Sequence, residues 1–86
     1  MILNIFSILD SKAEAFMQPF YAQTKGLAVR SFTEALNDSK SIFYKYPSEF
    51  LLYEVGTFDD KDCSITMHSP IQLIGNGSEF QKPVVE

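Results

Sequence analysis

A short run of lysines and aromatic residues carries the most suggestive chemistry in this chain. Between residues 40 and 46, Lys40 and Lys45 alternate with Phe43, Tyr44 and Tyr46. The bases of single-stranded nucleic acids stack on aromatic rings, and nearby cations bind the phosphates. The same aromatic side chains could instead pack under a sheet or at a contact between two copies, because aromatic residues dominate both kinds of burial. The sequence leaves both alternatives open.

Lys12, Lys25 and Arg30 would extend this candidate nucleic-acid surface if the fold brings them alongside the run. The overall charge opposes tight binding. Seven basic and eleven acidic residues give a net charge of −4, the wrong sign for a protein that holds duplex DNA through many phosphate contacts. Any direct binding is therefore predicted to be weak and to be lost quickly as salt rises.

Catalytic, metal-ligating and cofactor-binding motifs are not found. Asp59, Asp60 and Asp62 lack the central glycine and closing glutamate of a calcium loop, so they indicate a hairpin turn. Cys63 and His68 stand five positions apart without a second pair of zinc ligands, and the single cysteine cannot form an internal disulfide. No nucleophile or phosphate-loop motif occurs. We expect no enzyme, no metal and no cofactor.

The length of 86 residues leaves room for one domain, and 45% hydrophobic residues are enough for a core. We predict a single domain over residues 1–81 and a tail without a packing role over residues 82–86. A domain of this size is marginal alone, which favours a homodimer. No apolar run approaches the roughly 18 residues that span a bilayer, and residues 1–9 resemble a strand more than a signal peptide. A cytoplasmic location is expected.

Residues 2–9 alternate with apolar side chains on both faces, which predicts a central strand covered on both sides. After this strand, Ser11 and Glu14 have the spacing of a capping box, so we expect a short helical turn that ends before Pro19.

Residues 24–38 have helical periodicity. Ala28, Phe32 and Leu36 recur at four-residue steps, Thr24 is a suitable N-cap, and Arg30 stands one turn from Glu34. This segment is the main predicted helix.

Residues 49–55 and 64–68 alternate as strands on either side of the acidic turn, which predicts a hairpin. Pro70 and the turn at residues 75–77 bracket one further short strand, residues 71–74. The predicted fold class is therefore α+β, ordered β-α-β-β(-β), with one main helix packed on an antiparallel or mixed sheet.

Most of the chain, from about residue 2 to residue 75, resembles the small non-structural protein of the gokushoviruses, single-stranded DNA phages of the microvirus group. The resemblance rests on the opening strand and on four short strings. The strings are residues 10–16 (DSKAEAF), 19–20 (PF), 46–50 (YPSEF) and 56–60 (GTFDD). Single residues between them also match, namely Gly26, Ala28, Arg30, Phe32, Asn37, Asp38, Phe43, Leu52 and Glu54. Ser48 and Glu49 replace the usual Glu-Asp after the proline, and the sequence beyond Gly75 departs from the family pattern.

The resemblance implies a non-virion phage protein in the host bacterial cytoplasm, concerned with the switch from DNA replication to single-strand synthesis and packaging. Two hypotheses follow. In the first, the chain binds single-stranded phage DNA or the replication complex through the basic and aromatic residues named above. In the second, it is a protein-interaction module that engages the procapsid, the replication initiator or a host factor without touching DNA.

Overall fold

A computed structural model describes residues 1–81, so the predicted tail at residues 82–86 lies outside the described residues. The elements follow in the order β1 (Ile2–Asp10), β2 (Ala15–Phe16), β3 (Phe20–Ala22), α1 (Lys25–Leu36), α2 (Ile42–Lys45), the 3-10 helix η1 (Pro47–Glu49), β4 (Phe50–Asp59), β5 (Ser64–Asn76) and α3 (Gly77–Phe80).

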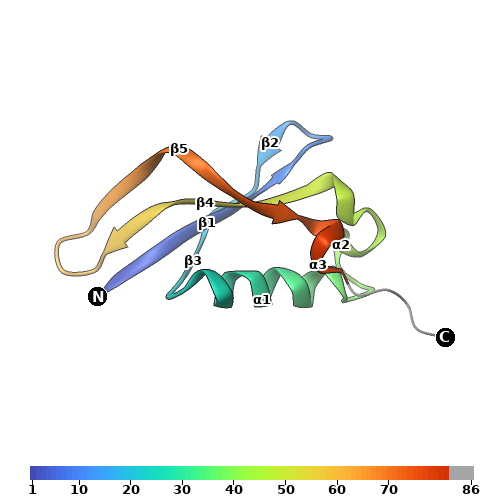
Figure 1. The fold of residues 1–86 in the computed structure, drawn as a ribbon, viewed down its shortest axis with the longest axis horizontal. Coiled ribbons are helices and arrows are strands. Elements are labelled where there is room, and N and C mark those ends of the chain that lie inside the picture. The colour runs from blue at the N-terminus through green and yellow to red at the C-terminus, as the bar shows by residue number, and fades with distance from the viewer. Residues whose placement is uncertain (82–86) are drawn as a thin grey trace.

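The strands form one sheet in the order β2-β1-β4-β5, and β3 pairs with the same edge of β1 as β2 but further along it (Figure 1). Every pairing is antiparallel. The N-terminal strand β1 is thus central, with β4 as its long partner. The α+β prediction is confirmed, and of its two alternatives the sheet is the antiparallel one.

Helix α1 packs along one face of the sheet (Figure 1). Thr24 caps the helix, because its hydroxyl accepts a hydrogen bond from the backbone N–H of Leu27 at 3.2 Å. The side chains at four-residue steps point into the core. The fully packed core consists of Phe6, Ile8, Ala28, Phe32, Leu36, Phe50 and Leu52. The predicted helix is confirmed to within two residues at either end.

The opposite face of the sheet carries no helix among residues 1–81, and we call it the helix-free face. Since Phe6 and Ile8 face α1, the alternation of β1 places Ser7 on the helix-free face, where Tyr53 and Leu73 are its neighbours on β4 and β5. The prediction that the fold covers β1 on both sides is confirmed for the middle of the strand, because Ile5 and Ser7 on the helix-free face are buried like Phe6 and Ile8, although no helix covers them.

The predicted helical turn after β1 is wrong. The Asp10 carboxylate accepts hydrogen bonds from the backbone N–H groups of Lys12 and Ala13, which closes a tight turn. Ser11 donates both its backbone N–H and its hydroxyl to the carbonyl oxygen of Glu49, at 2.9 and 2.8 Å, and so caps no helix. Glu14 has φ of 57°, a left-handed conformation that a right-handed helix excludes.

The predicted hairpin is confirmed and is longer than expected, because β4 and β5 pair on both sides of an irregular stretch. Asp59 and Asp62 stabilise the turn by accepting hydrogen bonds from the backbone N–H groups of Lys61 and Ser64. The hydroxyl of Ser64 also bonds Asp62 at 2.6 Å, and this hydrogen bond lowers the pKa of the Asp62 carboxyl below its usual range.

The stretch predicted as a separate strand, residues 71–74, is instead the second half of β5. Gly56 pairs with Met67 and Glu54 pairs with Gln72, so four residues of β5 stand opposite Val55 alone. The extra residues make β5 arch away from β4 between its two paired stretches (Figure 1). Proline suggested a strand end, whereas the strand continues beyond the arch.

Candidate nucleic-acid interface

The segment with the alternating lysines and aromatic residues forms a compact turn followed by α2. Asp38 accepts a hydrogen bond from the backbone N–H of Lys40 at 3.0 Å, and Ser41 caps α2 by accepting one from the N–H of Phe43 at 3.0 Å. Both bonds are local, and they set the direction in which the next side chains leave the backbone.

Phe43 anchors this segment to the core. Its ring lies edge-on to Phe50 at a centroid distance of 4.7 Å and to Phe32 at 5.7 Å. Tyr44 and Tyr46 point outward, with 37% and 52% of their surface exposed. The ammonium of Lys45 lies 5.7 Å from the centre of the Tyr46 ring, within the range of a cation–π contact. Two of the three aromatic residues are thus available on the surface, and Phe43 is mostly engaged inside.

Gln81 fastens α2 to the end of α1. Its side-chain amide donates hydrogen bonds to the carbonyl oxygens of Leu36 and Tyr44, both at 2.8 Å. These contacts satisfy the last carbonyls of two helices at once. No local pattern in the sequence predicts this role, because the partners lie 45 and 37 positions away.

We expect Gln81→Ala to lower the free energy of unfolding by about 1–2 kcal/mol, since a partly buried hydrogen bond to the Leu36 carbonyl and an exposed one to the Tyr44 carbonyl are lost. Urea unfolding followed by circular dichroism measures the change. Gln18→Ala is the matched control, because Gln18 is exposed and makes no hydrogen bond in the described part of the chain. Equal losses in the two variants would contradict the role given to Gln81.

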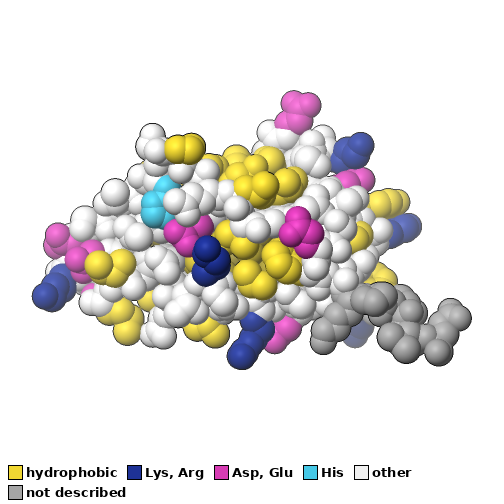
Figure 2. Space-filling view, in the orientation of Figure 1, with side chains coloured by type: hydrophobic (Ala, Val, Ile, Leu, Met, Phe, Trp, Pro, Cys, Tyr) yellow, Lys and Arg dark blue, Asp and Glu magenta, His cyan; other side chains and the backbone are white. Residues whose placement is uncertain are grey.

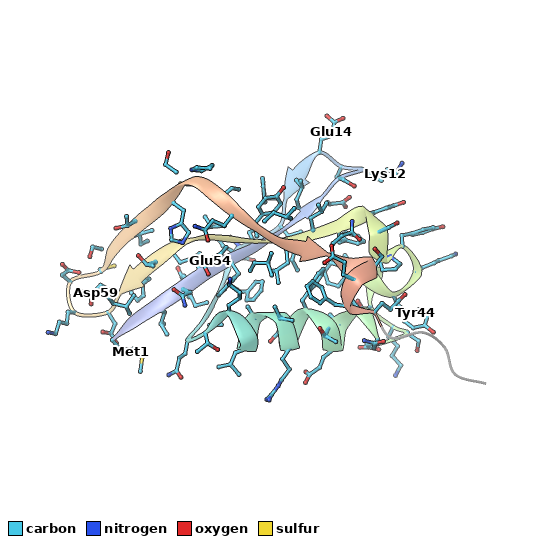
Figure 3. The ribbon with its side chains drawn as sticks, viewed as in Figure 1. Met1, Lys12, Glu14, Tyr44, Glu54 and Asp59 are labelled. Carbon is cyan, nitrogen blue, oxygen red and sulfur yellow. The ribbon has the colours of Figure 1, made fainter. Side chains whose placement is uncertain are left out.

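Lys12 lies at the same end of the molecule as α2. The two hydrogen bonds from Ser11 to Glu49 hold the Lys12 turn beside η1, which directly follows Tyr46. Figure 3 shows Lys12 and Tyr44 at one end of the molecule and Met1 and Asp59 at the other. We call the surface made by Lys12, Lys40, Tyr44, Lys45 and Tyr46 the aromatic–lysine end.

The two remaining candidates lie elsewhere. Lys25 is the first residue of α1, whose twelve residues extend about 18 Å, so Lys25 is a full helix length from the aromatic–lysine end. Arg30 is exposed in the middle of α1 and forms no ion pair with Glu34 in the described residues. The fold places three of the five predicted cations at one end of the molecule and the other two elsewhere.

Carboxylates share the aromatic–lysine end with the lysines. Asp10 binds the backbone of the Lys12 turn, Asp38 binds the backbone of Lys40, and Glu49 lies in η1. Figure 2 shows that basic and acidic side chains are interspersed over the visible face of the molecule. The end is therefore of mixed charge, and its exposed tyrosines are its more distinctive feature.

His68 and Cys63 do not share a site. Nε2 of His68 lies 2.7 Å from Oε2 of Glu54, and this contact ties the arched part of β5 to β4. Cys63 is exposed in the β4–β5 turn with φ of 64°. Within residues 1–81 no group of three or more histidine, cysteine or acidic side chains could hold a metal ion.

An apolar pocket of about 240 Å³ opens on the helix-free face, and no motif in the sequence predicted a site there. Figure 2 shows hydrophobic side chains gathered over the middle of the molecule, beside β2 and β5. The signal that could have revealed it is the apolar alternation on both faces of β1. The pocket is lined by Ser7, Phe16, Met17, Pro19, Val55, Met67 and Ile71.

Fold and surfaces together define a small α+β protein whose main surface features are an aromatic–lysine end and an apolar sheet face. Within residues 1–81 no helix is both long and apolar enough to cross a membrane. The chain belongs to the Phage ORF5 protein family, whose model matches residues 3–80. It is 33% identical over 85 residues to Protein ORF5 of Chlamydia phage 1, covering 93% of this chain and 88% of that protein. No solved structure matches. The predicted resemblance to a small phage protein is thus confirmed.

Proposed function

We propose that this phage protein acts by binding and not by catalysis, in the host cytoplasm, and that its aromatic–lysine end contacts single-stranded phage DNA within the replication complex. The contact would assist the change from DNA replication to single-strand synthesis and packaging. The observation that carries the proposal is the pair of exposed tyrosines, Tyr44 and Tyr46, beside Lys40 and Lys45.

The anchoring of α2 supports this function. Phe43 packs into the core and Gln81 bonds the α2 backbone, so Tyr44 and Tyr46 project from a supported element. An ordered aromatic ring binds a base with a smaller loss of conformational entropy than a mobile one. Stacking is tolerant of base identity, so sequence-independent contact with a single strand is the expected mode.

The carboxylates at the same end set the strength of the contact. Asp10, Asp38 and Glu49 repel phosphates, and the net charge of −4 adds to this repulsion. We therefore expect modest affinity at low salt and rapid loss as the salt concentration rises.

A protein partner at the same end is the second candidate. Tyrosine is enriched in protein interfaces, and Ile42, which is 63% exposed, adds an apolar contact that a nucleic acid would not require. The mixture of lysines and carboxylates would complement a partner surface that also carries both signs. This hypothesis requires no affinity for DNA.

Fluorescence polarisation of a labelled single-stranded oligonucleotide, measured across a salt series with a duplex for comparison, separates the two candidates. We expect Tyr46→Ala to weaken binding by about 5- to 150-fold, because stacking a base on an aromatic ring contributes roughly 1–3 kcal/mol. Lys45→Ala should reduce the slope of log affinity against log salt by about 0.7, the value for one phosphate contact on a single strand.

Tyr21→Ala and Lys61→Ala are the matched controls. Tyr21 is 53% exposed and stacks on Phe58, and Lys61 lies in the β4–β5 turn, so both are far from α2. Both controls should bind like the parent protein. If the folded parent protein fails to bind at low salt, the DNA hypothesis is wrong and the protein partner becomes the leading candidate.

A further inference from the structure

We propose that the helix-free face is the docking surface for a second copy of this chain. The two copies would pack sheet against sheet about a two-fold axis, with α1 on the outside of each. This surface is separate from the aromatic–lysine end and does not depend on what that end binds.

The first support is the composition of the helix-free face. Successive rungs across the sheet carry apolar side chains, and in the outer strand β5 these are well exposed, with Met67 at 64%, Ile65 at 59% and Leu73 at 56%. Exposed apolar side chains gathered on one face of a sheet indicate an interaction site. One rung consists of Leu3, Phe58 and Ile65, and in the next rung Ile5 and Met67 flank Gly56, which has no side chain.

Charge favours a copy of the same chain as the occupant. No lysine, arginine, aspartate or glutamate occurs between Asp62 and Glu79, so the whole of β5 is uncharged apart from His68. Natural edge strands usually carry charges that prevent association, and this one does not. Two chains of net charge −4 repel each other, and the apolar sheet face with its uncharged edge strand is where they can meet without placing charges together.

The size of the face can be compared with that of a stable interface. Ten residues of β4 at about 3.3 Å each, across the three long strands about 4.8 Å apart, give a flat footprint of roughly 475 Å². That value is below the roughly 800 Å² per partner of a standard interface, and the side chains that project from the face add to the area that a second copy would cover. The molecule is 49 Å long in its longest direction, so the sheet face is long enough for such a contact.

The apolar pocket on the helix-free face can receive a side chain from the second copy. At about 240 Å³ it is smaller than the roughly 300–1,000 Å³ of sites for drug-sized ligands, and its size suits a single apolar side chain. Side chains at the centre of an interface usually anchor in such pockets. In a two-fold arrangement each copy fills the pocket of the other, so two identical contacts form at once.

The dimer also offsets the small size of the core. Among residues 1–81 only eight hydrophobic side chains are buried, while Phe16, Met67 and Leu73 remain about half exposed or more. Sharing these side chains between two copies buries them without any change in the fold of the single chain.

Sedimentation equilibrium of the purified full chain over a wide concentration range tests the inference. We expect a species of twice the 9.8 kDa chain mass. Met67→Lys should raise the dissociation constant by about a hundredfold or more, because each copy would bury an unpaired ammonium at the contact. Ile42→Lys is the matched control, because Ile42 is 63% exposed but lies on α2, and it should remain dimeric.

Leu73→Lys provides a second disruptive variant, and circular dichroism checks that each variant is folded. A dimer also has a melting temperature that rises with protein concentration, whereas that of the disrupted variants should not. The inference is overturned if the parent chain is monomeric at the highest concentration, if it forms open-ended larger assemblies, or if Ile42→Lys dissociates as readily as Met67→Lys.

Discussion

Replacing Phe32 with alanine should lower the free energy of unfolding by about 3–5 kcal/mol, the usual loss for a buried phenylalanine and the cavity it leaves. Phe32 is 2% exposed, and Phe43 and Phe80 lie edge-on to its ring at centroid distances of 5.7 and 6.1 Å. A domain of this length is stable by only roughly 4–13 kcal/mol in total. The variant should therefore lose a large part of its stability.

The substitution should also loosen α2 at the candidate interface, because Phe43, which anchors α2, loses its contact with the Phe32 ring. Urea unfolding followed by circular dichroism gives the stability change, and hydrogen exchange at Tyr44 reports on α2 directly. Leu27→Ala is the matched control in the same helix, since Leu27 is 41% exposed, and it should change the stability by less than about 0.5 kcal/mol. Similar losses in both variants would refute the view that Phe32 holds the core together.

Gly56→Ala is expected to destabilise the protein by about 2–3 kcal/mol or more, although it adds only a methyl group. The added Cβ would overlap the backbone carbonyl oxygen of Thr66 and lie 3.0 Å from the Cα of Met67. Both obstacles belong to the backbone of β5, which cannot move away without breaking its pairing with β4. Glycine is required here by close approach of the two strands.

Gly26→Ala is the opposite case. The nearest atom to an added Cβ at Gly26 is the hydroxyl oxygen of Thr24 at 3.8 Å, which is an ordinary contact. In a helix such a substitution stabilises by roughly 0.5–1 kcal/mol, because alanine loses less conformational freedom on folding than glycine. Chemical unfolding of both variants should give changes of opposite sign. A stable Gly56→Ala protein would show that β5 can shift away from β4.

Local signals in the sequence were sufficient for α1 and for the β4–β5 hairpin. The apolar repeat and the Thr24 cap act within a few residues, and so do the aspartates that close the hairpin turn. Each of these features is decided by neighbours along the chain, so each could be predicted without knowing the fold.

Errors arose where distant partners decide the outcome. Ser11 matched a helix cap, but its hydroxyl bonds the carbonyl of Glu49, 38 positions away. For Phe43 the sequence left a stacking platform and internal packing both open, and the ring packs against Phe32 and Phe50. No local pattern distinguishes Phe43 from Tyr44 and Tyr46, which are exposed.

The two-residue strand β2 and the three-residue strand β3 are too short to produce a pattern at all. The helix-free face is a different case. The apolar alternation of β1 was interpreted correctly as two covered faces, but the sequence could not show that a helix covers only one of them.

The central position of β1 has a consequence for the order of folding during synthesis. Its pairing with β3 joins residues about 15 positions apart, so this edge can form early. Its other edge can pair only after β4 has been synthesised, since Ile2 pairs with Asp59 and Asp10 pairs with Phe50. At the usual 5–20 residues per second, β1 stays open on that edge for several seconds. A nascent chain that stalls between α1 and β4 would thus expose an apolar, half-paired strand, the state in which this protein is most vulnerable to aggregation.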